Sequence, residues 1–126
     1  MSGGDLMLVE DDETLAGLLA AHLRAHGYLV TVAPTAEAAQ GLLAGGARPD
    51  LLLLDINLPG ETGWSVLRSP AFDAAGRPSV LVASAMAVSP SRLREFGVAG
   101  YLPKPFALET LRSTIDRLLS KESDPT

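Results

Sequence analysis

Short apolar runs alternate along the chain with segments whose apolar residues recur at helical spacing. The apolar runs predict five β-strands, at residues 6–9, 28–33, 51–54, 80–83 and 101–102. The helical spacing predicts five helices, at residues 15–23, 36–43, 64–68, 90–96 and 108–118. Four consecutive leucines at 51–54 do not alternate with polar residues, so this strand should be buried on both faces, as in a parallel sheet. The pattern therefore predicts an α/β fold of type (βα)₅ with helices on both faces of the sheet.

Polar, glycine and proline residues mark where several of these helices begin and end. Asp12 and Thr35 are expected to be N-caps of the first two helices, and Gly27 should end the first one. The third helix should stop before Pro70, because the residue preceding a proline avoids the helical region. Pro90 suits the first turn of the fourth helix.

Composition adds limits on the class of protein. The 126 residues are 47% hydrophobic, enough for one domain with a single core. No cysteine is present, which excludes disulfides, thiolate metal sites and cysteine catalysis. A net charge of −5 argues against direct nucleic-acid binding, and no signal peptide or membrane span is recognisable, so we expect a cytoplasmic protein. We expect the domain to cover residues 5–120, followed by a polar tail or linker at 121–126.

Chemically suited residues follow several of the predicted strands. Glu10 and Asp11 follow the first strand, Asp55 the third and Ser84 the fourth, and Lys104 comes just after the fifth. Ligands bind outside the carboxyl ends of strands in such sheets, so these side chains should converge at one edge. Clustered carboxylates repel one another unless a cation relieves them, and Mg²⁺ prefers carboxylates and phosphate oxygens. Together with a lysine suited to phosphate and a carboxylate able to act as a nucleophile, the set favours phosphoryl transfer to Asp55.

Other polar and aromatic residues have simpler interpretations. Asp12 is expected only to cap a helix. His22 and His26 lie in the first helix, away from the strand ends, and have no partner at metal-ligand spacing, so they are interpreted as surface residues. Trp64 is interpreted as a packing residue.

Four motifs, in the right order and at the right strand ends, resemble the response-regulator receiver family. They are Leu-Val-Glu-Asp-Asp at 8–12, Leu-Leu-Asp-Ile-Asn-Leu-Pro-Gly at 53–60, Ala-Ser-Ala at 83–85, and Gly-Tyr-Leu-Pro-Lys-Pro-Phe at 100–106. The resemblance covers about residues 5–120. It implies a flavodoxin-like, doubly wound sheet with strand order 2-1-3-4-5.

The same resemblance implies a role for each residue of the cluster. Asp55 would be the phosphoacceptor and a Mg²⁺ ligand, and Asp11 would be a direct Mg²⁺ ligand. The backbone carbonyl of Asn57 would complete the protein's share of the metal shell, with Glu10 acting through water. Lys104 would contact the phosphoryl oxygens.

The resemblance also implies two residues that transmit a conformational change after phosphorylation. Ser84 takes the place of the family's hydroxyl residue that moves to the phosphoryl group, and Tyr101 that of the aromatic residue that then turns inward. The peptide bond between Lys104 and Pro105 is expected to be cis. The fourth helix, fifth strand and fifth helix are a possible homodimer surface.

The resemblance implies a signalling switch rather than a turnover enzyme. It would take a phosphoryl group from a histidine kinase or a histidine phosphotransfer protein, change conformation and dephosphorylate itself, acting on an unidentified downstream protein or output domain. One alternative is a receiver-like binding module that works without phosphorylation. Another is an aspartyl-phosphate phosphatase, which would need an acid where Asn57 stands.

Overall fold

The leucine run at 51–54 lies at the centre of a parallel sheet. In the computed structural model, which describes residues 3–123, five strands pair in the order β2-β1-β3-β4-β5. The strands are β1 (Asp5–Val9), β2 (Leu29–Ala33), β3 (Leu51–Asp55), β4 (Ser79–Ser84) and β5 (Gly100–Pro103). Every residue of β3 is buried. The predicted (βα)₅ class and the strand order implied by the resemblance are both confirmed.

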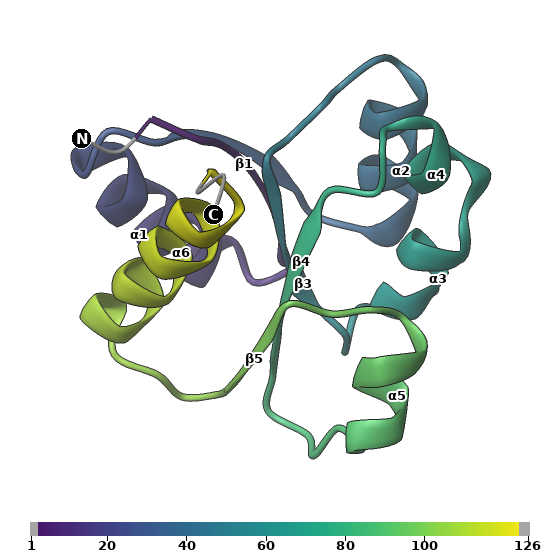
Figure 1. Ribbon diagram of the computed structural model, residues 1–126. Coiled ribbons are helices and arrows are strands. Elements are labelled where there is room, and N and C mark those ends of the chain that lie inside the picture. Colours follow the sequence, from purple (N-terminus) through teal and green to yellow (C-terminus); the bar gives the residue numbers. More distant parts are fainter. Residues whose placement is uncertain (1–2, 124–126) are drawn as a thin grey trace.

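Helices cover both faces of this sheet. They are α1 (Glu13–Ala25), α2 (Ala36–Ala44), α3 (Gly63–Arg68), α4 (Pro70–Ala74), α5 (Pro90–Glu95) and α6 (Leu108–Ser123). Figure 1 shows α1 and α6 on one side of the sheet and the other four helices on the opposite side. Successive side chains of a strand point to opposite faces, so Leu51 and Leu53 join the core under α1 and α6, whereas Leu52 and Leu54 join the other core. None of the helices in the described part of the chain is long and apolar enough to cross a membrane.

The predicted helix starts are confirmed by their caps. The Asp12 carboxylate accepts a hydrogen bond from the backbone N–H of Leu15 at 3.0 Å. The Thr35 hydroxyl accepts one from the N–H of Ala38 at 3.0 Å. Each cap satisfies a donor that the first turn of a helix leaves unpaired, which is worth about 1 kcal/mol.

The connection between β3 and β4 differs from the prediction. The pattern predicted one helix ending before Pro70, and α3 does end at Arg68. A second short helix, α4, then begins at once, because the Ser69 hydroxyl accepts a hydrogen bond from the N–H of Phe72 while donating to the carbonyl of Val66. Helix α4 buries Phe72, and so adds to the core. Its five residues are too few to show a helical period in the sequence.

The last helix is longer than expected. It continues to Ser123, beyond the expected start of the polar tail at residue 121. Residues 124–126, the rest of that predicted tail, lie outside the described part of the chain.

Candidate functional site

The carboxyl ends of β1 and β3 bring three acidic side chains together. Glu10 follows β1 and Asp55 is the last residue of β3, and both are buried, with 4% and 6% of their surface exposed. Asp11 is exposed beside them. One carboxylate oxygen from each of the three residues lies within 4.8 Å of the other two. The convergence predicted from the strand order therefore exists.

Lys104 supplies the charge that balances this cluster. Its ammonium nitrogen lies 2.6 Å from Oε1 of Glu10 and 3.2 Å from Oδ2 of Asp55. Burial raises the pKa of Glu10, and the hydrogen bond from Lys104 offsets only part of that rise. Burial by itself would lower the pKa of Lys104, but the hydrogen bond to Glu10 and the charge of Asp55 outweigh it and raise that pKa. Lys104 is therefore a protonated donor at neutral pH. The peptide bond between it and Pro105 is cis, as predicted.

The loop after β3 holds the Asp55 carboxylate in place. The backbone N–H of Asn57 donates to Oδ1 of Asp55 at 3.0 Å. The loop then folds back, and the N–H of Gly63 donates to the carbonyl of Ile56 at 2.9 Å. A Cβ atom at residue 63 would lie 2.5 Å from the carbonyl oxygen of Asp55, so only glycine permits this close return.

Ser84 and Tyr101 are linked through a residue that the sequence did not single out. Ser84 is 1% exposed, and its hydroxyl accepts a hydrogen bond from the N–H of Met86 at 3.1 Å. The Tyr101 hydroxyl donates to the carbonyl of the same Met86 at 3.3 Å. The N–H of Lys104 donates to the carbonyl of Ser84 at 2.9 Å, which ties this pair to the acidic cluster. Met86 takes part through its backbone alone, so its residue type carried no signal.

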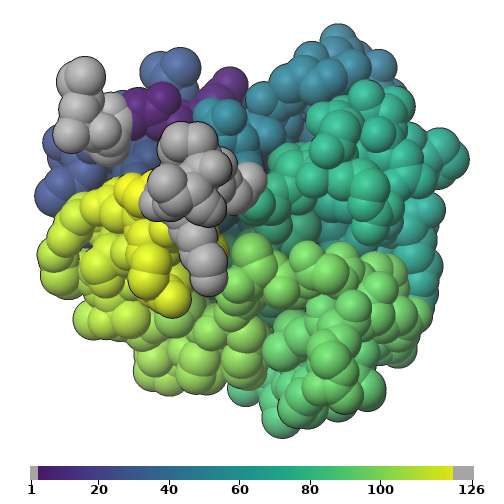
Figure 2. Space-filling view, viewed as in Figure 1, coloured from purple at the N-terminus to yellow at the C-terminus, as the bar shows by residue number. Residues whose placement is uncertain are grey.

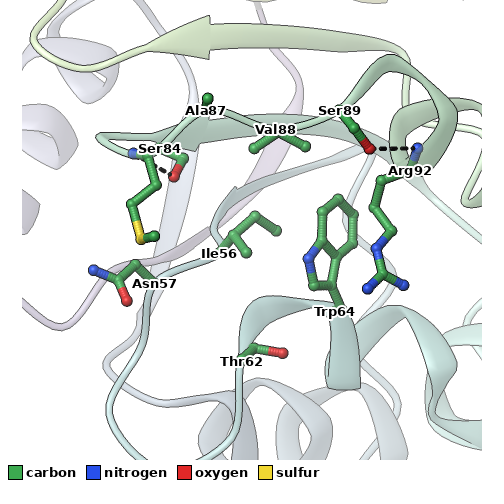
Figure 3. A pocket seen from close by; sticks show the side chains of 10 residues that line it. Ile56, Asn57, Thr62, Trp64, Ser84, Ala87, Val88, Ser89 and Arg92 are labelled. Atoms are coloured by element: carbon green, nitrogen blue, oxygen red, sulfur yellow. Dashed lines mark hydrogen bonds between the residues drawn. The ribbon is translucent and has the colours of Figure 1, made fainter.

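Two hollows meet at Asn57. The first, of about 340 Å³, is the acidic cleft, lined by Glu10, Asp11, Asp12, Leu15, Asp55, Asn57, Ala85 and Lys104. The second, of about 400 Å³, is lined by Ile56, Asn57, Thr62, Trp64, Ser84, Met86, Ala87, Val88, Ser89 and Arg92. Figure 3 shows Ser84 at one end of this second hollow and Trp64 at the other. The acidic cleft and the hollow beside Ser84 thus share Asn57 as a lining residue.

Trp64 both packs and lines that second hollow. Its ring stacks on Phe96, with centroids 4.8 Å apart, and only 8% of it is exposed. The guanidinium carbon of Arg92 lies 5.7 Å from the centroid of the Trp64 ring, beside it in Figure 3. The packing interpretation is confirmed.

The interpretation of His22 and His26 as surface residues holds for His26, which is exposed, but the fold gives both of them a neighbour that the sequence did not indicate. No partner ligand is near them in sequence, but the fold brings the Glu109 carboxylate to them from α6. His22 is also half-buried rather than fully on the surface. The contact was missed because it depends on how α1 and α6 pack together.

Comparisons with known proteins agree with this geometry. The family model described as "Response regulator receiver domain" matches residues 6–116. The transcriptional activator protein PfeR of Pseudomonas aeruginosa is 41% identical over 119 residues, covering 92% of this chain and 38% of PfeR. Protein PetR of Rhodobacter capsulatus is 36% identical, covering 92% of this chain and 48% of PetR. The chain thus spans less than half the length of these two relatives.

Solved structures give the same fold. The non-phosphorylated HemR receiver domain of Leptospira biflexa is 33% identical, with a TM-score of 0.81 over 93% of this chain and 94% of that one. A CheY-like receiver domain protein of Methanospirillum hungatei has a TM-score of 0.87 over 97% of this chain and 98% of that one, at 22% identity. With the family model matching most of its length, the chain belongs to the response regulator receiver domains of two-component systems.

Proposed function

We propose that this receiver domain accepts a phosphoryl group on Asp55 from the phosphohistidine of a histidine kinase or a histidine phosphotransfer protein. The observation that carries the proposal is the position of Asp55. Its carboxylate lies in an open cleft, 3.2 Å from the Lys104 ammonium and beside Glu10 and Asp11. A nucleophilic carboxylate with preplaced positive charge suits phosphoryl transfer.

The chemistry that we infer uses Asp55 as the nucleophile and the residues of the acidic cleft around it. An Asp55 carboxylate oxygen attacks phosphorus, and an O–P bond forms as the N–P bond of the donor breaks. The electron pair of that bond stays on the imidazole nitrogen, which takes up a proton. The Lys104 ammonium lies where it can pair with oxygens of the transferring group, whose three equatorial oxygens carry the spread charge. Later attack by water releases inorganic phosphate and restores the carboxylate, so the domain is a switch and not a turnover enzyme.

The acidic cleft also fits Mg²⁺. Its donors are carboxylates, the hard oxygen ligands that this ion takes. We assign Asp11, Asp55 and the Asn57 carbonyl as direct ligands and Glu10 as a ligand through water. Both Glu10 oxygens already accept hydrogen bonds, one from Lys104 and one from the N–H of Asp12 at 3.1 Å, which supports an indirect role. Bound Mg²⁺ would supply positive charge next to the phosphoryl oxygens.

A labelling experiment tests the proposal. With Mg²⁺ and acetyl phosphate, the wild-type domain should gain one phosphoryl group by intact mass, and hydroxylamine should remove it, as expected for an acyl phosphate. Asp55→Asn should stay unlabelled because an amide is a poor nucleophile. Asp73→Asn, which removes an exposed carboxylate on α4, is the matched control and should be labelled normally. Equal labelling of Asp55→Asn would falsify the assignment.

The metal ligands can be tested separately. Trp64 is the single tryptophan of the chain and lines the hollow that shares Asn57 with the acidic cleft, so its fluorescence can follow a Mg²⁺ titration. Asp11→Ala should weaken Mg²⁺ binding severely. An Asp11→Ala protein that binds Mg²⁺ as well as wild type would remove Asp11 from the ligand set.

The output of the switch belongs to the same proposal. Movement of Ser84 toward the phosphoryl group would break its bond with the N–H of Met86, and Tyr101, bonded to the same residue, would respond. Both neighbour the surface of α5, β5 and α6, which we propose as a homodimer face. Figure 2 shows α6 (yellow) and α5 (green) exposed on one side of the molecule. Sedimentation with and without beryllofluoride would detect the dimer, and an unchanged monomer would refute it. Because several relatives are named as transcriptional regulators, we propose transcription as the output, exerted outside residues 1–126.

A further inference from the structure

Three potential metal ligands meet on the face of the molecule opposite the second hollow, where α1 packs beside α6. His22 lies in the last turn of α1, and His26, four residues later, is the C-cap of that helix. Their imidazole rings lie close together on the same side of the helix end. Glu109 lies in the first turn of α6. One ligand atom from each of the three side chains lies within 4.8 Å of the other two. Figure 1 shows α1 and α6 side by side.

An unsatisfied nitrogen gives this cluster a second, independent feature. The Nε2 atom of His22 is buried and has no hydrogen-bond partner among the described residues. The two imidazole rings meet edge to face, with centroids 4.8 Å apart. Buried polar atoms in folded proteins nearly always have a partner, and a site for a bound ion is one recognised reason for an exception. An ion held between the three side chains would satisfy the His22 nitrogen.

The donor types select the ion. Two imidazoles and one carboxylate are an established ligand set for Zn²⁺, with a fourth position left for water. Mg²⁺ prefers oxygen ligands and would favour the acidic cleft instead. With metal–ligand distances of about 2.0–2.1 Å, the ligand atoms of a tetrahedral site lie about 3.4 Å apart. Side-chain rotations that shorten the separations by about 1–1.5 Å therefore suffice.

The third ligand is able to make this adjustment. The Glu109 side chain is 67% exposed, so packing does not restrict its rotation. Its carboxylate pairs with Arg112, which also pairs with Asp116. A carboxylate that ligates a metal usually keeps such a hydrogen-bonded partner, because each oxygen carries two lone pairs. Arg112 can therefore orient Glu109 without blocking it.

We infer that His22, His26 and Glu109 form a Zn²⁺ site that joins α1 to α6, separate from the acidic cleft. Zinc bound there stabilises the packing of the first helix on the last one. Its composition makes the site easy to isolate experimentally. His22 and His26 are the only histidines of the chain, and there is no cysteine to compete for zinc.

The test uses zinc chloride with the acidic cleft kept saturated by Mg²⁺. One equivalent of Zn²⁺ should shift the imidazole NMR signals of both histidines, raise the melting temperature and bind with one-to-one stoichiometry in calorimetry. Loss of an outer-shell partner already weakens metal binding by roughly 10–100-fold, so losing a direct ligand should cost at least about tenfold. His26→Gln and Glu109→Gln should each show this loss. Asp73→Asn, which removes an exposed carboxylate on α4 outside both sites, is the matched control and should bind Zn²⁺ like wild type.

Specific results would overturn the inference. Imidazole signals that stay in place at one equivalent of Zn²⁺ would show that the histidines are not ligands. Wild-type zinc affinity in both His26→Gln and Glu109→Gln would show that neither side chain is a zinc ligand. A loss of zinc binding in Asp11→Ala but not in Glu109→Gln would place the zinc in the acidic cleft instead.

Discussion

Removal of the Lys104 charge should destabilise the domain in a way that depends on pH. Lys104→Met keeps much of the side-chain volume but removes the ammonium that contacts Glu10 and Asp55. Glu10, with 4% of its side chain exposed, would then be a buried carboxylate beside a second one. Removing one partner of a buried ion pair commonly costs about 3–5 kcal/mol, because the remaining charge is neither hydrated nor paired.

The loss of unfolding free energy in Lys104→Met has an upper limit, because the buried Glu10 carboxyl can take up a proton instead of staying charged. The ordinary pKa of Glu10 is 4.5, and each pH unit above that value makes protonation cost about 1.4 kcal/mol more. The ceiling for Glu10 is thus about 3.4 kcal/mol at pH 7 and below about 1 kcal/mol at pH 5. The variant does not have to desolvate a lysine ammonium on folding, which offsets part of this cost. We therefore expect its free energy of unfolding to fall by about 2–3 kcal/mol at pH 7.

Proton linkage decides whether the stability difference between wild type and Lys104→Met grows or shrinks with pH. Burial already raises the pKa of Glu10 in the folded state, and loss of the Lys104 hydrogen bond removes the main opposing effect. A group whose pKa is raised by folding contributes its full stability below the unfolded pKa and loses it as the pH rises through the folded pKa. The stability gap between wild type and Lys104→Met should therefore widen from pH 5 to pH 7.

Urea unfolding without Mg²⁺ at these two pH values measures the gap. Arg94→Met, which removes an exposed positive charge on α5, is the control and should change stability by less than about 0.5 kcal/mol at either pH. Added Mg²⁺ should stabilise Lys104→Met more than wild type, since it can replace the missing charge. A gap that is equal at both pH values, or larger at pH 5, would refute the reasoning.

Three further predictions concern the switch, the Asp55 loop and the core. Ser84→Ala should still accept phosphate but lose the amide NMR shifts that beryllofluoride and Mg²⁺ propagate through residues 85–105; identical shifts in both proteins would exclude a role for Ser84. Gly63→Ala places a Cβ 2.5 Å from the Asp55 carbonyl oxygen, so the free energy of unfolding measured in urea should fall by about 1–3 kcal/mol, and labelling by acetyl phosphate should be slower. Gly41→Ala on α2 is the control, because a Cβ there meets nothing within 4 Å, and it should not destabilise the domain. Leu81→Ala, fully buried in β4, should cost about 2–5 kcal/mol without changing the labelled residue.

The acidic cleft was predictable because parallel topology decides most of it. Once the leucine run at 51–54 indicates a strand buried on both faces, neighbouring strands must run parallel and end at the same edge. Residues that directly follow those strands, such as Glu10, Asp55 and Lys104, then meet without any knowledge of helix packing. Their exact pairing was not predictable, because the 2.6 Å contact between Lys104 and Glu10 depends on two long side chains and a loop.

Backbone contacts and short elements were harder to predict. Met86 links Ser84 and Tyr101 through its N–H and carbonyl, which every residue except proline possesses in full. Helix α4 is too short for a periodic signal, and only the Ser69 cap and Pro70 mark its start. The Met86 link depends on backbone groups and the start of α4 on a capping serine and a proline, and the pattern of apolar residues indicates neither.

The His22, His26 and Glu109 cluster shows a different limit. The four-residue spacing alone puts the two histidines on one side of the C-terminal end of α1. The third ligand depends on the rotation of α6 about its own axis and on its register along α1. Those are set by the buried residues Leu111 and Ile115 of α6 and by the Tyr28 hydroxyl, which donates to Asp116. Sites at strand ends thus follow from topology, whereas a site between two helix faces follows from side-chain packing. A zinc ion at the second kind of site would report directly on the packing of α1 against α6, so any rearrangement of that pair on phosphorylation of Asp55 should change the zinc affinity, and phosphorylation and zinc should then affect each other equally.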